Sequence, residues 1–223
     1  MARLLPSGPS VIAPGVAHLP GWLGPDLRIE LVERCRVWSE ASGGARSPRM
    51  RNGSSMSVRM VGLGWHWYPY RYARTRDDGD GGRALAFPRW LGDLSRRAVV
   101  DAVAIDPLLA GDPGTFAPDV ALVNWYGPEA MMGMHVDRDE VVPEPVVSLS
   151  IGATGVFRFG NPAGRGRPWV DVPLESGDAV VFGGPSRFAY HGVTRLVPGT
   201  DDPVVGPLPG RLNVTVRQTG LLG

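Results

Sequence analysis

Apolar side chains recur every three or four residues in two segments, and this spacing predicts two amphipathic helices. The first helix spans residues 26–40, and its apolar stripe is formed by Leu27, Leu31, Cys35 and Trp38. The second spans residues 88–104, begins with a proline in its first turn, and carries on one side Trp90, Leu94, Ala98 and Ala102. We therefore expect the first part of the chain to contribute a helical layer.

After Pro118 the pattern changes to short runs rich in β-branched and aromatic residues, each ended by Gly, Pro or Asp. These runs predict strands at 120–126, 132–137, 145–151, 155–160, 168–174, 178–184, 189–193 and 211–218. Many short strands at close spacing are typical of a sandwich or barrel. The expected fold class is therefore mainly β with flanking helices: a double-sheet jelly roll with a helical N-terminal layer packed on it.

Residues 41–85 are rich in Gly, Arg and aromatic side chains and show little periodicity. Such a segment fits a cover of loops and hairpins over one mouth of the roll. We expect a single domain, 1–223, with four parts: a helical layer at 1–40, this cover at 41–85, a helix and connection at 86–118, and the jelly-roll core at 119–220.

Composition excludes several classes of protein. Of the 223 residues, 43% are hydrophobic and 20% are charged, which is typical of a globular chain and not of a disordered one. No apolar run approaches the ~18 residues of a membrane span, and residues 1–20 lack the compact apolar segment of a signal peptide. We therefore expect a cytoplasmic protein with no membrane association. The one cysteine, Cys35, excludes an internal disulfide and a cysteine-based zinc finger.

Positive charge is concentrated in one region, although the net charge of the chain is only +1. All 23 basic residues are Arg, and residues 45–97 contain eleven of them against four Asp. Clustered guanidinium groups suit a phosphate-rich partner, so this region is a candidate contact for nucleic acid.

A candidate metal site begins with the tripeptide H-V-D, in which His135 and Asp137 share one face if the segment is extended. By itself such a tripeptide is usually a solvated or hydrogen-bonded pair. A third ligand must come from elsewhere, and His191 lies in the Y-H-G of another predicted strand. Two imidazoles and one carboxylate leave metal positions open, which suits a non-haem Fe(II) that also binds a cosubstrate and O2.

The last predicted strand has one apolar and one polar face. Its polar face is formed by Arg211, Asn213, Thr215 and Arg217, and its apolar face by Leu212, Val214 and Val216. A surface strand would explain this pattern, but two inward Arg would also make a site for a small dicarboxylate. Because the two Arg lie ~20 Å apart along a strand, the strand must curve for both to reach one ligand. Asn124 and Tyr126 could add hydrogen bonds to such a site.

These segments, taken in order, resemble the AlkB family of alkylation-repair dioxygenases. The matching segments are N-W-Y at 124–126, H-V-D-R-D-E at 135–140, P-V-V-S-L-S-I-G at 145–152, F-R-F-G at 157–160, G-D-A-V-V-F-G-G-P-S-R-F-A-Y-H-G at 177–192 and R-L-N-V-T-V-R-Q-T-G at 211–220. G-W at 64–65 and Tyr72 match more loosely, and the chain before Ser54 has no specific match. The resemblance implies a double-stranded β-helix oxygenase that uses Fe(II), 2-oxoglutarate and O2.

The resemblance also implies roles for individual residues. The iron ligands would be His135, Asp137 and His191. Arg211 would pair with the distal carboxylate of 2-oxoglutarate with help from Tyr126, and Arg217 would lie near the carboxylate that chelates iron. Their neighbours in the 2-oxoglutarate site would be Asn124, Asn213 and Thr215. These assignments follow from matching positions in the family motifs.

On the substrate side, the resemblance makes residues 41–85 a nucleotide-recognition lid. Trp65 would stack against the flipped base, Tyr72 would contact a phosphate, and Asp139 would accept a hydrogen bond from the exocyclic amine. One Arg of the 160s loop would also contact substrate, with Arg165 preferred over Arg167. The remaining lid aromatics, Trp67, Tyr68 and Tyr70, are expected to be packing or lid residues, and His18 and His66 receive no role.

The implied activity is oxidative demethylation of N-alkylated bases, of the 1-methyladenine and 3-methylcytosine type, in single- or double-stranded DNA or in RNA. It would release succinate, CO2 and formaldehyde, with no obligate protein partner. An acidic side chain beside an aromatic ring suits such a cationic base. Two alternatives remain: an oxygenase of the same fold acting on RNA, protein or a small molecule, and a non-catalytic nucleic-acid-binding jelly roll.

Overall fold

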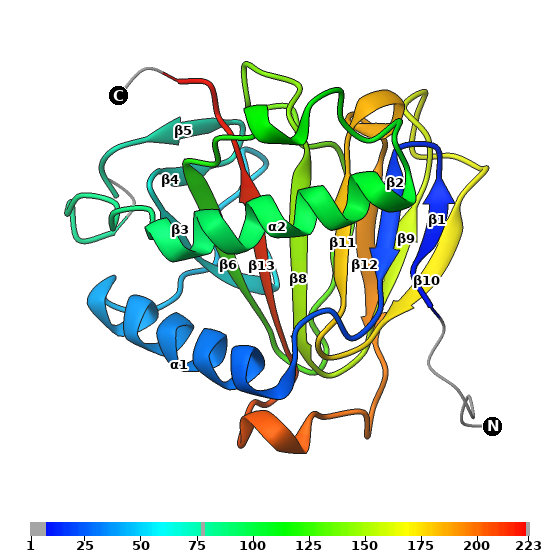
Figure 1. Cartoon of the computed structure of the whole chain (residues 1–223). Helices are drawn as coiled ribbons and strands as arrows, with labels where there is room; N and C mark the ends of the chain where they lie inside the picture. The colour runs from blue at the N-terminus through cyan, green and yellow to red at the C-terminus, as the bar shows by residue number, and fades with distance from the viewer. Residues whose placement is uncertain (1–7, 77–78, 222–223) are drawn as a thin grey trace.

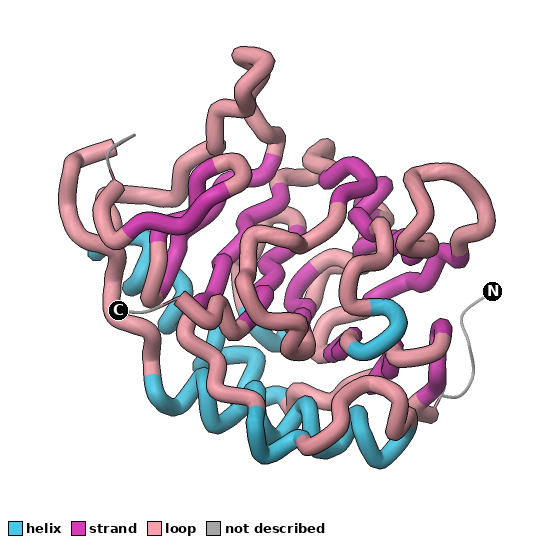
Figure 2. The backbone as a smooth tube through the Cα atoms, turned by 90° about the horizontal axis from the view of Figure 1, so that it is seen from above, coloured by secondary structure: helices cyan, strands magenta, loops and turns pink. Residues whose placement is uncertain are grey.

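Two β-sheets packed face to face, with two long helices on the outer side of the larger one, form the architecture (Figure 1). The computed structural model describes residues 8–76 and 79–221. Seen from above, both helices lie along one side of the strands (Figure 2). This arrangement confirms the expected mainly β jelly roll with flanking helices.

The larger sheet has seven strands in the order β1-β2-β11-β8-β13-β6-β3. Their bounds are β1 Ser10–Ala13, β2 Val16–Leu19, β3 Val58–Leu63, β6 Val120–Tyr126, β8 Val146–Gly152, β11 Ala179–Phe182 and β13 Arg211–Arg217. Strand β13 lies between β6 and β8 and pairs with both in antiparallel register over most of its length. Its neighbours therefore fix which of its side chains point to each face of the sheet.

The smaller sheet has four strands in the order β10-β9-β12-β7. Their bounds are β7 Met132–His135, β9 Gly155–Phe159, β10 Val170–Leu174 and β12 His191–Leu196. A separate hairpin is formed by β4 His66–Tyr68 and β5 Arg71–Ala73. Three short 3₁₀ turns complete the described elements: Pro113–Thr115, Gly184–Ser186 and Pro203–Val205.

Helices α1 Pro25–Ala41 and α2 Arg89–Ile105 cover the outer face of the larger sheet. The apolar side chains of β13, Leu212, Val214 and Val216, are fully buried in the same cluster as Leu94 and Ala98 of α2. A second apolar cluster fills the space between the sheets and includes Phe157, Phe159 and Phe182. The predicted stripes of both helices accordingly face the outer cluster, with Trp38 and Trp90 at its edge.

Two parts of the chain differ from the sequence-based expectation. Residues 1–40 were expected to form a helical layer, but residues 10–19 form β1 and β2, and β2 pairs with β11 at one side of the larger sheet. Within the expected cover at 41–85, β3 joins the larger sheet by pairing with β6. In both cases a short segment gains a partner strand, which local hydrophobic spacing does not reveal.

In the part of the chain that the structure describes, we find no helix that combines the length and the apolar character needed to cross a membrane.

Candidate active site

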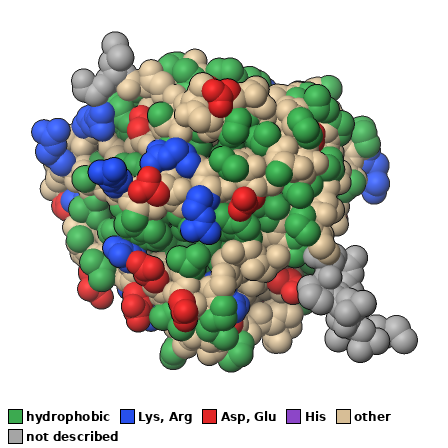
Figure 3. Space-filling view, in the orientation of Figure 1, with side chains coloured by type: hydrophobic (Ala, Val, Ile, Leu, Met, Phe, Trp, Pro, Cys, Tyr) green, Lys and Arg blue, Asp and Glu red, His purple; other side chains and the backbone are tan. Residues whose placement is uncertain are grey.

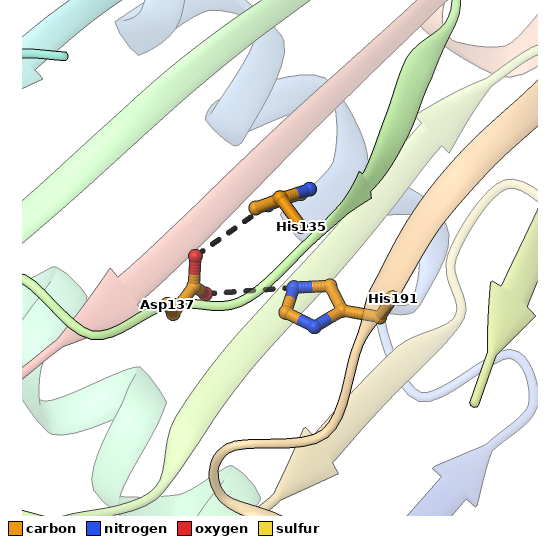
Figure 4. A group of neighbouring side chains, drawn as sticks. All are labelled: His135, Asp137 and His191. Carbon is orange, nitrogen blue, oxygen red and sulfur yellow. Dashed lines mark ion pairs between the residues drawn. The ribbon is translucent and has the colours of Figure 1, made fainter. Parts of the chain in front are cut away.

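Three side chains converge between the end of β7 and the start of β12. His135 is the last residue of β7 and lies opposite His191, the first residue of β12, in the antiparallel pairing. Asp137 follows two residues after β7, on a loop and not inside a strand as the sequence predicted. Its two carboxylate oxygens lie 3.5 Å from His135 Nε2 and 3.6 Å from His191 Nε2 (Figure 4). One ligand atom from each residue lies within 4.8 Å of the others, so the group could hold a metal ion.

Backbone carbonyls orient both imidazoles. His135 Nδ1 lies 2.9 Å from the carbonyl oxygen of Gly133, and His191 Nδ1 lies 3.0 Å from that of Ala189. A carbonyl only accepts, so each Nδ1 carries the proton and each Nε2 directs its lone pair toward the shared point. Such hydrogen bonds to the second ring nitrogen are usual for metal-binding histidines.

The environment of the three side chains lowers the pKa values of Asp137 and His191 but raises that of His135. Burial by itself would raise the pKa of the Asp137 carboxyl, but Arg217 and the two imidazoles hold this pKa well below its ordinary value. Burial and the neighbouring His135 lower the pKa of His191. Burial also opposes protonation of His135, yet Asp137 raises its pKa. Asp137 is therefore ionised and His191 neutral at pH 7, as in a metal site before binding.

A buried guanidinium occupies the other end of the inner face of β13. Arg211 is 1% exposed and donates to Ser150 Oγ at 2.6 Å and to the carbonyl oxygen of Leu174 at 3.2 Å. Its Nε has no hydrogen-bond partner, and it forms no ion pair with any residue between 8 and 221 that the structure describes. Burial lowers the pKa of this guanidinium. Asp178 acts on this guanidinium only electrostatically, without a direct ion pair, so a carboxylate of a bound ligand would supply the missing contact.

Space for that guanidinium depends on Gly155 in β9. A Cβ at this position would lie 3.0 Å from Arg211 Nε and 3.1 Å from its Cζ. Tyr126 lies directly opposite Arg211 in the pairing of β6 with β13, and burial raises the pKa of its hydroxyl to about 12. The phenol is therefore a neutral hydrogen-bond donor at this end of the cavity.

Polar side chains connect the two ends of β13. Asn213 receives a hydrogen bond from Asn124 at 3.1 Å and from Thr215 at 2.9 Å, and it donates to Ser148 Oγ at 2.8 Å. At the far end, Arg217 lies 2.7 Å from Asp137 and 3.1 Å from Glu140. The inner face of the strand is thus polar over its whole length, and Arg211 and Arg217 line one cavity.

The cavity has a volume of about 730 Å³ and contains the three converging side chains and the inner face of β13. Of the residues singled out from the sequence, it is lined by Asn124, Tyr126, His135, Asp137, Asp139, Arg165, His191, Arg211, Asn213, Thr215 and Arg217. Arg165 donates through Nε to the carbonyl oxygen of Met134, whereas Arg167 packs on Trp169 outside the cavity. The structure therefore brings Arg165, and not Arg167, to the cavity.

Trp65 does not lie where the sequence predicted. It is 7% exposed, donates through Nε1 to Asp119 at 3.1 Å, and has the guanidinium of Arg74 over its ring at 3.5 Å. Trp67 lines the cavity instead, and its Nε1 donates to Asp139 Oδ2 at 2.8 Å. Trp65 lies in the bend that follows β3 and begins at Gly64, whose φ is +80°, whereas Trp67 lies inside β4, so strand alternation does not relate the two tryptophans.

Tyr72 also differs from the expectation that it contacts a phosphate. Its hydroxyl lies 2.5 Å from Glu140 Oε1 and 3.1 Å from Arg217 Nη1. Burial raises the pKa of this hydroxyl well above its ordinary value. The side chain belongs to a buried network beside Asp137, because Glu140 supplies a charged acceptor inside the protein that competes with any outside partner.

Several side chains at the site were missed or left without a role by sequence reasoning. Arg187 is 1% exposed and donates to Glu140 and to the backbone carbonyls of Asp137 and Glu144, which holds the loop that carries Asp137. Tyr70, at φ +74°, lines the cavity from the turn of the β4–β5 hairpin. Glu140 belongs to the H-V-D-R-D-E segment that matched the family, so this motif could have indicated it. Trp65 and Trp67 both lie in W-H-W, and no local pattern shows which of the two lines the cavity.

The arginines of residues 45–97 do not line this cavity among the described residues. Some of them pack on lid aromatics, as Arg51 does on Tyr70 at 4.9 Å and Arg71 on Tyr68 at 4.4 Å. Others belong to α2, and the face of the molecule that carries this helix shows basic and acidic side chains interspersed (Figure 3). The local excess of positive charge is therefore distributed over more than one face.

Comparisons with known proteins agree with this geometry. Residues 15–217 match the family model described as the 2OG-Fe(II) oxygenase superfamily. An alpha-ketoglutarate-dependent dioxygenase AlkB homolog of Caulobacter vibrioides is 37% identical over 215 residues, which cover 94% of this chain and 90% of that protein. The AlkB dioxygenase of Escherichia coli is 38% identical over 136 residues, 60% of this chain and 57% of that one.

Two relatives with ALKBH1 names are similar over most of this chain. The DNA N(6)-methyladenine demethylase ALKBH1D of Arabidopsis thaliana is 31% identical over 93% of this chain, which spans 50% of that protein. The solved structure of OsALKBH1 has a TM-score of 0.83 and 32% identity, and the match covers 94% of this chain and 99% of that one. The chain therefore belongs to the AlkB family within the 2OG-Fe(II) oxygenase superfamily, and it is an Fe(II)- and 2-oxoglutarate-dependent dioxygenase.

Proposed function

We propose that this protein removes N-linked methyl groups from nucleic-acid bases by oxidative demethylation. The observation that carries the proposal is one cavity lined by the His-Asp-His group, by the buried Arg211, which has no ion pair among the described residues, and by Asp139 beside Trp67. These are the three parts that a demethylase of this family needs: a metal site, a cosubstrate site and a base pocket.

In this proposal His135, Asp137 and His191 hold Fe(II). Arg211 binds the distal carboxylate of 2-oxoglutarate, where a bidentate ligand would satisfy the unpartnered Nε. Tyr126 donates to the same carboxylate, and the Asn124, Asn213 and Thr215 network fixes the wall between the two ends. When bound, Fe(II) with 2-oxoglutarate and O2 supplies the oxidation of an N-methyl group to a hydroxymethyl group, which leaves as formaldehyde with succinate and CO2 as the other products.

Asp139 and Trp67 form the base-binding end. The indole N–H fixes one oxygen of the Asp139 carboxylate, and the other oxygen has no hydrogen-bond partner among the described residues. Burial raises the pKa of this carboxyl. A cationic base such as 1-methyladenine or 3-methylcytosine would receive both a hydrogen-bond acceptor and an aromatic face here. A base inside a duplex cannot reach such a pocket unless it is extruded, and stacking would offset ~1–3 kcal/mol of that cost.

The nucleic-acid backbone would pass the mouth of the cavity. Arg138 and Arg165 are exposed side chains that line it, so their guanidinium groups are available to phosphates. The named activities of relatives include DNA N(6)-methyladenine demethylation and tRNA demethylation. For this chain we propose alkylated DNA, single- or double-stranded, as the substrate, with RNA as the alternative within the same chemistry.

The test is a turnover assay with Fe(II), 2-oxoglutarate and a panel of oligonucleotides that differ only in one base. The panel contains 1-methyladenine, 3-methylcytosine and N6-methyladenine in DNA and in RNA, each with its unmethylated counterpart. We expect formaldehyde to accumulate with a methylated strand in a one-to-one ratio to the repaired base. Succinate formation that no methylated strand stimulates would contradict the proposal and favour a protein or small-molecule substrate.

A further inference from the structure

Methionine is distributed in an uneven way in this protein. The chain has seven methionines, and the six within the described residues all line the cavity that contains the His-Asp-His group: Met50, Met56, Met60, Met131, Met132 and Met134. Methionine is suited to irregular apolar walls, but its thioether is also the apolar side chain most easily oxidised. Gathering these sulfurs around a site that activates O2 therefore has a chemical consequence.

Met132 points into the roll. It lies opposite Val193 in the pairing of β7 with β12, and its side chain packs against the inner apolar cluster between the sheets. Its Sδ lies 3.8 Å from the hydroxyl of Tyr126, at the end of the cavity where Arg211 is buried. Phe157 and Phe159 belong to the same cluster. Their ring centroids lie 6.0 Å and 6.2 Å, respectively, from the ring centroid of His191.

Met131, its neighbour in sequence, has the opposite environment. It is 54% exposed, and its backbone is hydrogen-bonded to the Ser57 hydroxyl at the rim of the cavity. Two adjacent thioethers thus line one cavity, one open to solvent and one packed inside. An oxidant that arrives from solvent reaches Met131 first, whereas one that forms inside the cavity reaches Met132 first.

We propose that Met132 is a self-oxidation site, which takes up the oxidising equivalent when 2-oxoglutarate is consumed without a nucleic-acid substrate. The proposal rests on the proposed function for the metal and cosubstrate sites. A lone pair of the Met132 sulfur forms the new S–O bond with one atom of O2, and 2-oxoglutarate receives the other atom as it loses CO2. The O–O bond breaks, and O2 gains four electrons, two from the sulfur and two from 2-oxoglutarate. The products are methionine sulfoxide, succinate and CO2.

Sulfoxide formation at Met132 changes the cosubstrate site. A sulfoxide oxygen is a strong acceptor, and the Tyr126 hydroxyl beside it is a donor. Tyr126 would then donate to Met132 in place of 2-oxoglutarate. Turnover without substrate would be self-limiting in consequence, and a methionine sulfoxide reductase could reverse the modification.

The test is peptide mass spectrometry after incubation with Fe(II), 2-oxoglutarate and O2, with catalase present and nucleic acid absent. Fragment ions distinguish the two neighbouring residues. We expect a several-fold excess of sulfoxide at Met132 over Met131. A second sample treated with hydrogen peroxide alone should show the reverse order, with Met131 oxidised first.

Two variants separate the possible outcomes. Met131→Leu should retain oxidation at Met132, while Met132→Leu should sustain succinate formation for longer relative to its own initial rate. Unmodified Met132 in a sample that has produced succinate would overturn the inference, although the metal and cosubstrate sites would then be supported. A sample with no succinate contradicts the function on which the inference rests, and equal oxidation of both methionines would assign the reaction to a solvent-borne oxidant.

Discussion

The inner face of β13 and the β4–β5 hairpin line opposite parts of one cavity, and they differ in how their side chains are directed. On β13 the polar and apolar residues that alternate in the sequence face opposite sides of the sheet, as predicted, because strands β6 and β8 pair with it on both sides. At the hairpin, Trp65 and Trp67 are two residues apart, but only Trp67 lies inside β4: Trp65 is buried against Asp119, and Trp67 lines the cavity. A strand held on both sides keeps its register, whereas a two-stranded hairpin takes the orientation that its tertiary contacts impose.

The residues proposed to bind metal and cosubstrate therefore lie in a different kind of structure from those proposed to bind the base. The proposed metal and cosubstrate ligands lie on paired strands or on a loop tied down by Arg187. The proposed base contacts lie on the hairpin and on the loops at 138–139 and 161–169. Substitutions in the first group should remove turnover, whereas substitutions in the second should change substrate affinity.

The largest effect is expected from His135→Ala. Loss of one of three metal donors should reduce succinate formation by at least about 100-fold, since even indirect partners of a metal ligand cost 10–100-fold. Binding of Mn²⁺, measured by calorimetry, should be lost in parallel. His66→Ala, in the hairpin and outside the cavity, is the matched control. Turnover near that of the unmodified protein would remove His135 from the metal site.

Arg211→Ala should weaken 2-oxoglutarate binding next most strongly. Truncating one partner of a buried charge pair costs about 2–5 kcal/mol, which corresponds to at least about a 30-fold rise in the apparent KM for 2-oxoglutarate. Gly155→Ala is a subtler variant, because its Cβ would displace the same guanidinium without removing it. We expect it to raise the same KM by less. An unchanged KM in both variants would contradict the assignment.

The two tryptophans provide the sharpest test of the comparison. Trp67→Ala should weaken binding of a methylated oligonucleotide by ~1–3 kcal/mol through the lost stacking, with uncoupled succinate formation retained. Trp67→Phe should restore much of the affinity. Fluorescence anisotropy with a labelled strand measures both.

Trp65→Ala should act on stability instead. Removing this buried indole should lower the free energy of unfolding by about 3–5 kcal/mol, measured by chemical denaturation at a temperature where the variant is folded. If Trp65→Ala lost oligonucleotide affinity while keeping its stability, and Trp67→Ala did the opposite, the assignment of the base-stacking residue would be reversed.

The smallest effect is expected at the loop that follows β9. Arg165→Ala should remove about one phosphate contact. The slope of the logarithm of the oligonucleotide binding constant against the logarithm of the salt concentration should therefore fall in magnitude by about one. Arg167→Ala is its matched control, since this guanidinium packs on Trp169 outside the cavity. Equal changes in both variants would mean that the loop acts only through its charge.

Sequence reasoning located most of the strands and the polar face of β13, since alternation and turn residues are local properties. The order of the motifs also identified the family and its cosubstrates. The local pattern of residues did not predict β1, β2 or the place of β3 in the larger sheet, because the partner strands lie far away along the chain. These segments are strands by virtue of their partners as much as of their own residues.

At the site, the sequence by itself determined which residue types were present and how they were spaced: H-V-D, a distant histidine and two arginines on one face of a strand. Only the tertiary structure decided that His135 and His191 face each other across β7 and β12, that Arg165 lines the cavity, and that Trp67 does so in place of Trp65. The physical reason is that local spacing fixes the direction of a side chain only while a strand continues. In the bend at residues 64–65, and between residues brought together by pairing of distant strands, direction and distance are set by the packing of the whole chain.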